Sequence, residues 1–320
     1  MTSITQAGPA VSAGPAAPRP ASRKTVDKRK WLEIGLFLGP AVIIFVGFVI
    51  LPVALAAVYS FFNWNGLGPL EKFIGIDNYT RALSDPLFLR SIGNNFTIII
   101  ASLLVQGPLA IIVALLLNRK MRGRTIVRAA IFVPYVLAEV IAGLSWKLLL
   151  SPQGGVNAVL EAIGLGGLTQ PWLANPAIAL WVMFFILTWK YLGFAVLLML
   201  AGLQGVPEEL TEAAAIDGAS WWKTQWYITI PLLGPTIRIW AFLSIIGSLQ
   251  LFDMVWVTTR GGPVGATSTM ATYMIQYGQG QPGYGSAVAV ILFLISLVIA
   301  LLYQRHALRR DLGAENVEER

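Results

Sequence analysis

The chain contains no cysteine, which excludes disulfide bridges, thiolate metal sites and cysteine nucleophiles. It contains a single histidine, His306, and one histidine cannot form a metal-binding cluster, so no metal site is expected. Charged residues make up only 12% of the chain, about half the share found in soluble domains. The motifs GxxxxGK[ST], HExxH and GxSxG are all missing, so the sequence predicts neither a phosphate-binding loop nor a common hydrolase. No cofactor is expected on this chain.

Hydrophobic residues are abundant instead, at 56% of the 320 residues. They gather in six runs that can each cross a bilayer, which takes about 20 apolar residues. The six runs are residues 31–59, 94–118, 126–150, 178–203, 235–258 and 285–304. This pattern predicts an all-α membrane protein with six transmembrane helices.

The first 30 residues are rich in Ala, Pro, Ser and Gly and end in a basic cluster. Such a composition is typical of a disordered segment. The run that follows, residues 31–59, is too long for the hydrophobic part of a signal peptide. We therefore expect residues 1–30 to form a disordered, basic, uncleaved cytoplasmic tail.

The positions of the basic residues predict the orientation, because Lys and Arg accumulate on the cytoplasmic side of a membrane. The tail, the 118–128 connection and the C-terminal end are rich in them, whereas the 151–177 loop has none and the 260–283 loop has only Arg260. Both termini and the 207–234 segment are therefore expected in the cytoplasm. The net charge of +7 then reflects membrane topology and does not require a nucleic-acid partner.

Residues 207–234 form a polar segment between two hydrophobic runs. Glu208 and Glu209 suit the first turn of a helix, and Gly218 suits its end. Three tryptophans follow within six residues, at positions 221, 222 and 226. From these features alone, the segment is either a solvated loop with surface helices or a docking element for a cytoplasmic partner.

A spaced motif favours docking. Glu212-Ala213-Ala214, three residues, Gly218, nine residues and then Ile228-x-Ile230-Pro231 resembles the EAA loop of ABC importer permeases. Ile230 in place of the usual Leu is the one departure.

The resemblance extends along most of the chain and is closest to the sugar-importer branch of these permeases, the MalF/UgpA-like proteins. It is carried by stretches in matching order: 73–79 (FIGIDNY), 117–134, 146–155 (WKLLLSPQGG), 252–263 and 283–287. It implies the type I ABC importer permease fold. The expected organisation is a first transmembrane helix and outer loop over 31–90, a permease core over 91–305 with the EAA loop at 207–234, and a cytoplasmic tail over 306–320.

The resemblance also implies a mechanism and a set of partners. A multi-pass protein of the bacterial plasma (inner) membrane would pair with a second permease subunit within the membrane lipid. An extracytoplasmic solute-binding protein would deliver substrate, and a dimer of cytoplasmic ABC ATPases would bind the ATP. The implied ATPase-coupling residues are Glu212, Ala213, Ala214, Asp217, Gly218 and Pro231.

Ionisable or polar residues inside the hydrophobic runs are candidates for the substrate path, because charges are costly in a bilayer. The candidates are Lys190, Tyr191, Gln250, Asp253 and Glu139. Lys190 can equally have a structural role. Gln250 and Asp253 are three residues apart and are expected on one helix face.

Several functions are compatible with these features. The leading hypothesis is a permease subunit of an ATP-driven importer for sugars or oligosaccharides. The alternative is a permease for glycerol-3-phosphate or another small polar solute. An integral-membrane enzyme lacks a catalytic constellation here, and a passive channel does not explain the EAA segment. The sequence does not name the sugar, because a separate binding protein largely sets specificity.

Overall fold

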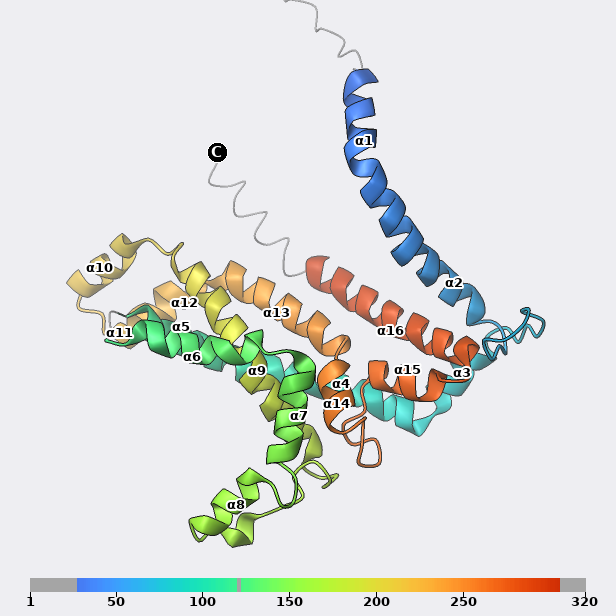
Figure 1. Cartoon of the computed structure of the whole chain (residues 1–320). Helices are drawn as coiled ribbons and strands as arrows, with labels where there is room; N and C mark the ends of the chain where they lie inside the picture. The colour runs from blue at the N-terminus through green and yellow to red at the C-terminus, as the bar shows by residue number, and fades with distance from the viewer. Residues whose placement is uncertain (1–27, 120–121, 306–320) are drawn as a thin grey trace, which may run out of the picture. The chain divides into compact units, whose positions relative to one another are not determined.

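The computed structural model describes residues 28–119 and 122–305 (Figure 1). The chain divides into two compact units, Met1–Pro52 and Val53–Arg320. Residues 1–27 of the expected N-terminal tail and the whole expected C-terminal tail, 306–320, with His306, lie outside the described residues.

The first hydrophobic run forms a continuous helical stretch. It consists of α1 (Lys28–Phe45), the short π-helix η1 (Val46–Ile50) and α2 (Leu51–Tyr59). Helix α1 begins at Lys28, so its first three residues overlap the end of the expected tail. The stretch Ile34–Tyr59 is long and apolar enough to cross a membrane, as expected for the first span.

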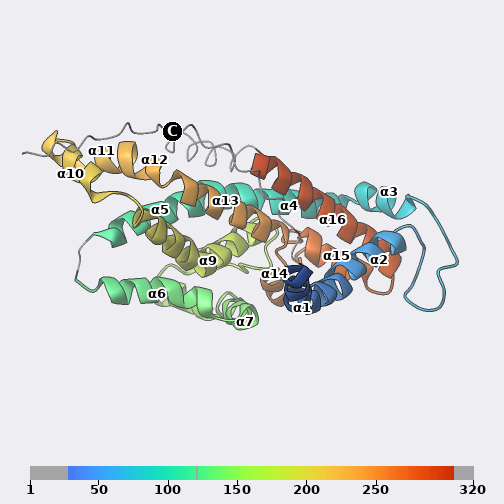
Figure 2. The same cartoon turned by 90° about the horizontal axis from the view of Figure 1, so that it is seen from above.

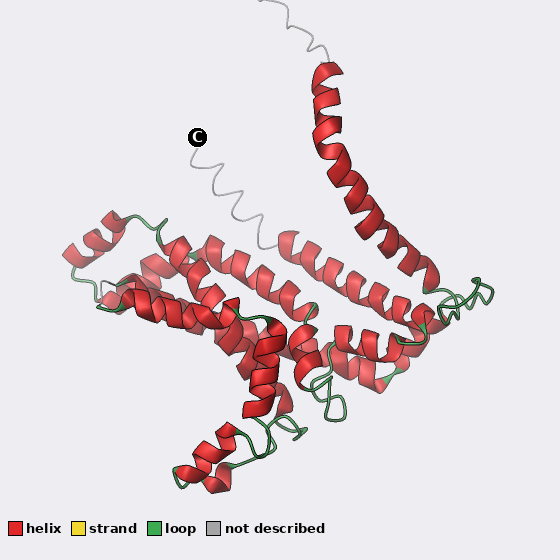
Figure 3. Cartoon of the chain, in the orientation of Figure 1, coloured by secondary structure: helices red, strands yellow, loops and turns green. Residues whose placement is uncertain are grey.

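The rest of the described chain is also helical, and its one β-bridge joins Phe62 to Phe73 outside any strand (Figure 3). The remaining elements are α3 (Asp77–Ser84), α4 (Pro86–Ala101), η2 (Ser102–Gln106), α5 (Gly107–Asn118), α6 (Arg124–Val136), α7 (Glu139–Leu149), α8 (Gly155–Ala162), η3 (Gly166–Leu168), α9 (Ala179–Leu203), α10 (Glu208–Ile216), α11 (Trp221–Thr224), η4 (Gln225–Thr229), α12 (Ile230–Leu232), α13 (Gly234–Leu249), α14 (Asp253–Thr258), α15 (Met270–Gly278) and α16 (Pro282–Tyr303).

Six spans result if each bent helix pair counts as one. Beyond the first stretch, three are unbent: Pro86–Asn118, Ala179–Leu203 and Pro282–Tyr303. The other two are bent pairs within the described residues. Helices α6 and α7 meet at 98°, and the stretch Trp221–Leu232 meets α13 at 66°. The fold class agrees with the prediction, and the predicted six spans are reached when both bent pairs cross the membrane.

Two predicted spans differ in their internal structure. The run 126–150 is not one helix, because Leu137 and Ala138 adopt extended backbone with ψ of 140° and separate α6 from α7. The run 235–258 is also interrupted: α13 ends at Leu249 and the short helix α14 begins at Asp253. Hydrophobicity reports how long an apolar run is, and it does not report where tertiary contacts break the helix.

Helix α9 is the centre of the second unit. It packs against α5, α6 and α13, and α6 runs beside it in both views (Figures 1 and 2). Gly193 permits the contact with α6, since a Cβ there would lie 2.3 Å from the carbonyl oxygen of Ile131. Buried side chains of α5 and α9, such as Ala114 and Met199, form one core cluster with Leu233 and Trp240.

The segment between α14 and α16 is tied to α4 by buried polar contacts. The Asp85 side chain caps α4 by accepting from the Leu87 amide, and its other oxygen accepts from the Tyr273 hydroxyl at 2.5 Å. Burial, together with the hydrogen bond to Asp85, raises the pKa of Tyr273. The phenol therefore stays protonated and donates to Asp85 throughout the physiological pH range.

Candidate functional sites: a cytoplasmic helix pair and a transmembrane cavity

Helix α10 ends in a rigid turn at the predicted position. Gly218 has φ of 75°, the left-handed conformation that glycine adopts at little cost. The Gly218 amide donates to the Ala215 carbonyl at 3.1 Å, and the Ala219 amide donates to the Ala214 carbonyl at 2.9 Å. These two hydrogen bonds define a Schellman motif, which satisfies the last carbonyls of the helix. The turn directs the chain into α11, which packs against α10.

Most of the predicted coupling residues present an open surface. Glu212, Ala213, Asp217, Gly218 and Pro231 are exposed. Ala214 is the exception at 8% exposure, because it lies on the inner side of α10. The same segment exposes large apolar side chains: Ile216 (87%), Trp222 (62%), Trp226 (68%) and Tyr227 (75%). Acidic residues and large exposed apolar side chains thus stand together on this segment, a combination that fits a protein contact better than a solvated loop.

The helix pair lies at the same end of the second unit as the basic 118–128 connection. The guanidinium of Arg119 stacks over the ring of Trp221, 4.1 Å from its centroid. A cation above an indole face is an attractive contact. This contact joins two segments that the charge distribution places on one side of the membrane. It also gives Trp221 a packing partner, whereas Trp222 and Trp226 remain exposed.

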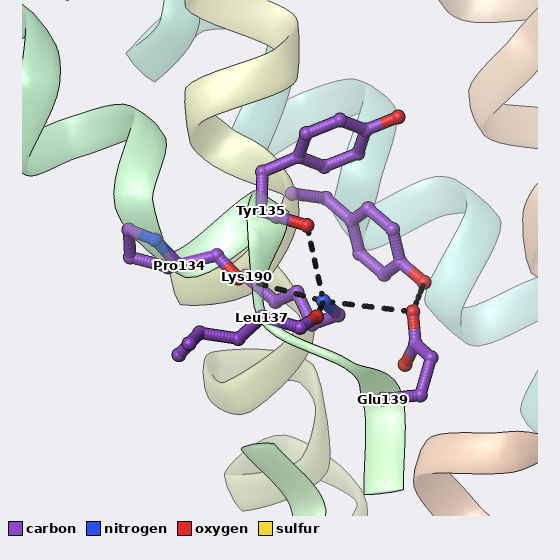
Figure 4. A network of polar contacts seen from close by, with 6 residues as sticks. Pro134, Tyr135, Leu137, Glu139 and Lys190 are labelled. Carbon is purple, nitrogen blue, oxygen red and sulfur yellow. Dashed lines mark hydrogen bonds and ion pairs between the residues drawn. The ribbon is translucent and has the colours of Figure 1, made fainter. Parts of the chain in front are cut away.

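Lys190 and Glu139, from α9 and α7, meet at the break between α6 and α7 (Figure 4). The Lys190 Nζ is buried and donates to the carbonyl oxygens of Leu137 at 2.6 Å, Tyr135 at 3.3 Å and Pro134 at 3.4 Å. It lies 3.7 Å from Glu139 Oε1.

The charges of this cluster complement the two helix ends at the break: the cation lies at the C-terminus of α6 and the carboxylate at the N-terminus of α7. The last turn of α6 has carbonyls that the helix itself cannot satisfy, and the Lys190 ammonium supplies their donors. Glu139 stands in the first turn of α7, where the helix dipole favours a carboxylate. The Tyr191 hydroxyl donates to Glu139 Oε1 at 2.5 Å. Two adjacent side chains of α9, Lys190 and Tyr191, thus stabilise the break between α6 and α7.

A cavity of about 200 Å³ lies beside this cluster, between α4, η2, α9 and α13. Its wall is partly aromatic and partly polar. Tyr191 lines the cavity and also donates a hydrogen bond to Glu139, so it connects the cavity to the cluster. None of its lining residues carries a charged side chain. They are Ile98, Ser102, Gln106, Tyr135, Phe184, Leu187, Tyr191, Phe194, Trp240, Leu243, Ser244, Gly247, Ser248 and Leu251.

Hydrogen bonds order the polar side of the cavity. The Ser102 hydroxyl lies 2.6 Å from Gln106 Oε1 and 2.8 Å from the Ser244 hydroxyl. Ser248 lies one turn beyond Ser244 on α13. The wall therefore offers a short row of hydroxyl and amide groups opposite the aromatic rings of α9.

Three of the five substrate-path candidates are in direct contact, and a fourth, Asp253, is close enough to Tyr191 to interact with it electrostatically. Lys190, Tyr191 and Glu139 form the cluster, and of these Tyr191 lines the cavity. Gln250 and Asp253 are exposed, in the interruption between α13 and α14. The expectation that they share one helix face is wrong, because α13 ends at Leu249, before Gln250, and Asp253 begins a different helix.

Sequence reasoning missed a buried asparagine that holds this second interruption. Asn95 on α4 is fully buried. Its Nδ2 donates to the Ser248 carbonyl at 2.6 Å, and its Oδ1 accepts from the Met270 amide at 2.9 Å. The sequence feature that could have revealed this residue is the Asn94-Asn95 pair at the start of the apolar run 94–118. Ser102 and Gln106, four residues apart later in the same apolar run, were also detectable by their spacing.

Comparisons with known proteins agree with this architecture. Residues 106–311 match the family model described as "Binding-protein-dependent transport system inner membrane component". The multiple sugar-binding transport system permease protein MsmF of Streptococcus mutans is 35% identical over 270 residues, which cover 83% of this chain and 92% of that protein. The trehalose/maltose transport system permease protein MalF of Thermococcus litoralis is 33% identical over 279 residues, covering 86% and 94%.

A solved structure gives the same result. A chain of a bacterial alginate ABC transporter, in complex with an alginate pentasaccharide-bound periplasmic protein, superposes with a TM-score of 0.77. The two chains are 26% identical, and the match covers 88% of this chain and 96% of that one. The similar proteins are transport permeases and not enzymes. The chain belongs to the binding-protein-dependent transport system inner membrane components, the multi-pass permeases of ABC importers.

Proposed function

We propose that this chain is one of two permease subunits of an ATP-driven importer for neutral sugars or oligosaccharides. The observation that carries the proposal is the wall of the cavity, which joins hydroxyl and amide groups to aromatic rings and contains no charged side chain among its lining residues. Sugars combine hydroxyl groups with apolar ring faces, so they match such a wall.

The state of Lys190 supports a neutral solute. It is the cation nearest to the cavity wall in sequence, adjacent to Tyr191, but its ammonium is already engaged by three carbonyls and by Glu139. An anionic solute such as glycerol-3-phosphate would need a cation with a free hydrogen-bonding position. The names of the similar permeases, which refer to trehalose and maltose or to multiple sugars, agree with a carbohydrate.

The helix pair α10 and α11 is the proposed coupling element. Its exposed face would lie in a groove of a cytoplasmic ATPase, and the turn at Gly218 would transmit closure of the ATPases as a rigid-body movement. ATP would bind to those partners, so this chain needs no cofactor. A second permease would complete the path, and an extracytoplasmic solute-binding protein would deliver the sugar.

Uptake measurements test the proposal. A strain that lacks this chain is compared with strains that carry the wild type, Glu212→Ala or Glu161→Ala, on a panel of radiolabelled mono- and disaccharides. We expect the deletion to lose uptake of at least one sugar and Glu212→Ala to remain inserted without restoring it. Glu161 is an exposed acid in α8, in the loop predicted to be outside, so Glu161→Ala is the matched control and should restore uptake.

Two results would contradict the proposal. If every sugar is still imported after the deletion, the carbohydrate assignment fails and glycerol-3-phosphate is tested next. If Glu212→Ala restores full uptake, α10 is not the coupling element.

A further inference from the structure

A second cavity, of about 150 Å³, lies between α6 and α9 near the cytoplasmic end of both helices. Its wall is apolar along most of its length, with Phe132 on α6 and Leu197 and Leu200 on α9. Two polar side chains stand in its lining, Arg128 and Gln204. Its shape and chemistry therefore suit an amphipathic ligand with an acceptor at one end and an apolar part at the other.

Arg128 has an unused donor at this position. Its Nη2 donates to the Leu117 carbonyl at 3.2 Å, near the end of α5. Its Nε is buried and has no hydrogen-bond partner among the residues that the structure describes. A guanidinium has five N–H donors in a planar fork, which binds phosphate oxygens in pairs. The described part of the chain provides no acceptor for this donor.

The surroundings match the inner headgroup layer of a membrane. Arg119, Arg122 and Arg124 lie in the same connection, and residues 118–128 contain no acidic residue. The apolar lining of the cavity is open at Leu197, whose side chain is 52% exposed. Basic pockets between transmembrane helices at this depth attract anionic lipid headgroups.

We propose that the α6–α9 groove binds an anionic phospholipid, whose phosphate pairs with Arg128 and whose acyl chain lies along Phe132, Leu197 and Leu200. An anionic lipid supplies both the phosphate and the apolar chain that the groove requires. Inorganic phosphate would satisfy Arg128 and leave the apolar wall uncovered.

Native mass spectrometry of the full-length chain, purified with the subunits that accompany it, tests this site. The protein is reconstituted in equal parts of phosphatidylglycerol and phosphatidylcholine and then exchanged into detergent. We expect the wild type to retain phosphatidylglycerol preferentially, and Arg128→Gln to reduce that retention about tenfold, as for the loss of a charge-assisted contact. Arg122→Gln removes an exposed charge from the same connection and should retain the lipid as the wild type does.

A second variant keeps the test independent of Arg128, which also stabilises the end of α5. Ala201 is exposed and lines the groove, so Ala201→Phe should fill it and lower lipid retention while leaving the charge in place. Excess inorganic phosphate should not displace the lipid. Equal retention by Arg128→Gln and Arg122→Gln would overturn the proposal. A photoreactive side chain at position 197 should form lipid adducts, and an adduct with another protein subunit instead would assign the groove to that subunit.

Discussion

Buried polar side chains of this protein stabilise helix ends that belong to other helices. Lys190 on α9 donates to the carbonyls at the end of α6, Asn95 on α4 to those at the end of α13, and Arg128 on α6 to one near the end of α5. A bilayer core provides no water for such carbonyls, so each interruption needs a donor from the protein. Lys190 and Asn95 therefore stabilise the interruptions after α6 and after α13, and Arg128 stabilises the end of α5.

Substituting Lys190 tests this role directly. Lys190→Met removes the donor for the α6 carbonyls and leaves the Glu139 carboxylate without its cation. Breaking a buried pair on one side costs about 3 kcal/mol, and the partial exposure of Glu139 makes this an upper value. We expect a clear fall in the thermal unfolding midpoint of the detergent-solubilised protein, measured by size-exclusion chromatography after heating.

Lys147→Met is the matched control. Lys147 is exposed on α7 and makes one long contact, 3.4 Å, to the Val257 carbonyl, so its loss should leave the midpoint within experimental error. The double variant Lys190→Met with Glu139→Gln should recover part of the loss because the unpaired charge is gone. A midpoint for Lys190→Met equal to that of Lys147→Met would exclude a stabilising role for the cluster.

Asn95 gives a second prediction at this scale. Asn95→Leu leaves the Ser248 carbonyl and the Met270 amide buried without this partner. An unsatisfied buried polar group costs about 1–3 kcal/mol. We expect the same heating assay to show destabilisation, whereas Thr97→Ala, which removes an exposed contact to the Gly93 carbonyl of its own helix, should be close to neutral. Comparable midpoints for the two variants would mean that the loop after α13 does not depend on Asn95.

Among the helices, local signals were predictable and tertiary interruptions were not. Gly218 ends α10 where its sequence neighbours indicated, because a left-handed helix end is encoded within a few residues. The break at Leu137 and Ala138 depends on Lys190, more than fifty residues away in the chain, so no local pattern shows it. The cavity has the same property. Ser102 and Ser244 meet only when η2 and α13 pack, and only Tyr191 of the cavity lining was a predicted site residue.

The end of α10 carries a prediction of its own. Gly218→Val places a β-branched residue at φ of 75°, where a left-handed backbone costs about 1–2 kcal/mol per non-glycine residue. No atom lies within 4 Å of a Cβ at this position, so the effect comes from the backbone alone. We expect the protein to insert normally, to lose sugar uptake and to retain less ATPase on purification.

A conservative change at the same position separates strain from side-chain bulk. Asparagine tolerates the left-handed region, so Gly218→Asn should keep most of the uptake that Gly218→Val loses. If Gly218→Val transports at the wild-type rate, the turn does not transmit the movement of the ATPases.

At the scale of the whole molecule, the proposed coupling site and the proposed sugar-binding cavity lie in different parts of the second unit. The helix pair α10 and α11 joins the connection before α6 through Arg119 and Trp221, while the cavity is enclosed by the long spans. Transport would need both sites. The cavity would provide the path for the sugar, and the helix pair would connect that path to ATP hydrolysis by the ATPases. Their common element is α9, which lines the cavity and leads directly into α10.

The membrane topology of the chain depends on whether the bent pair α6 and α7 crosses the bilayer. If the pair crosses the membrane, the connections before α6 and after α7 lie on opposite sides, whereas a re-entrant pair would return to the same side. The absence of cysteine makes single-cysteine labelling direct, since each introduced thiol reports one position. Arg122, Gln153 and Glu209 are all exposed and mark three successive connections.

We expect a membrane-impermeant maleimide to label Gln153→Cys in intact spheroplasts, and to label Arg122→Cys and Glu209→Cys only after the membrane is permeabilised. The reason is that the basic 118–128 connection and the 207–234 segment share the cytoplasmic side, where the Arg119–Trp221 contact joins them. The cysteine-free wild type is the background control. Labelling of Arg122→Cys and Gln153→Cys from the same side would show that α6 and α7 are re-entrant, and the chain would then have five spans with its coupling segment on the other side from its N-terminal tail.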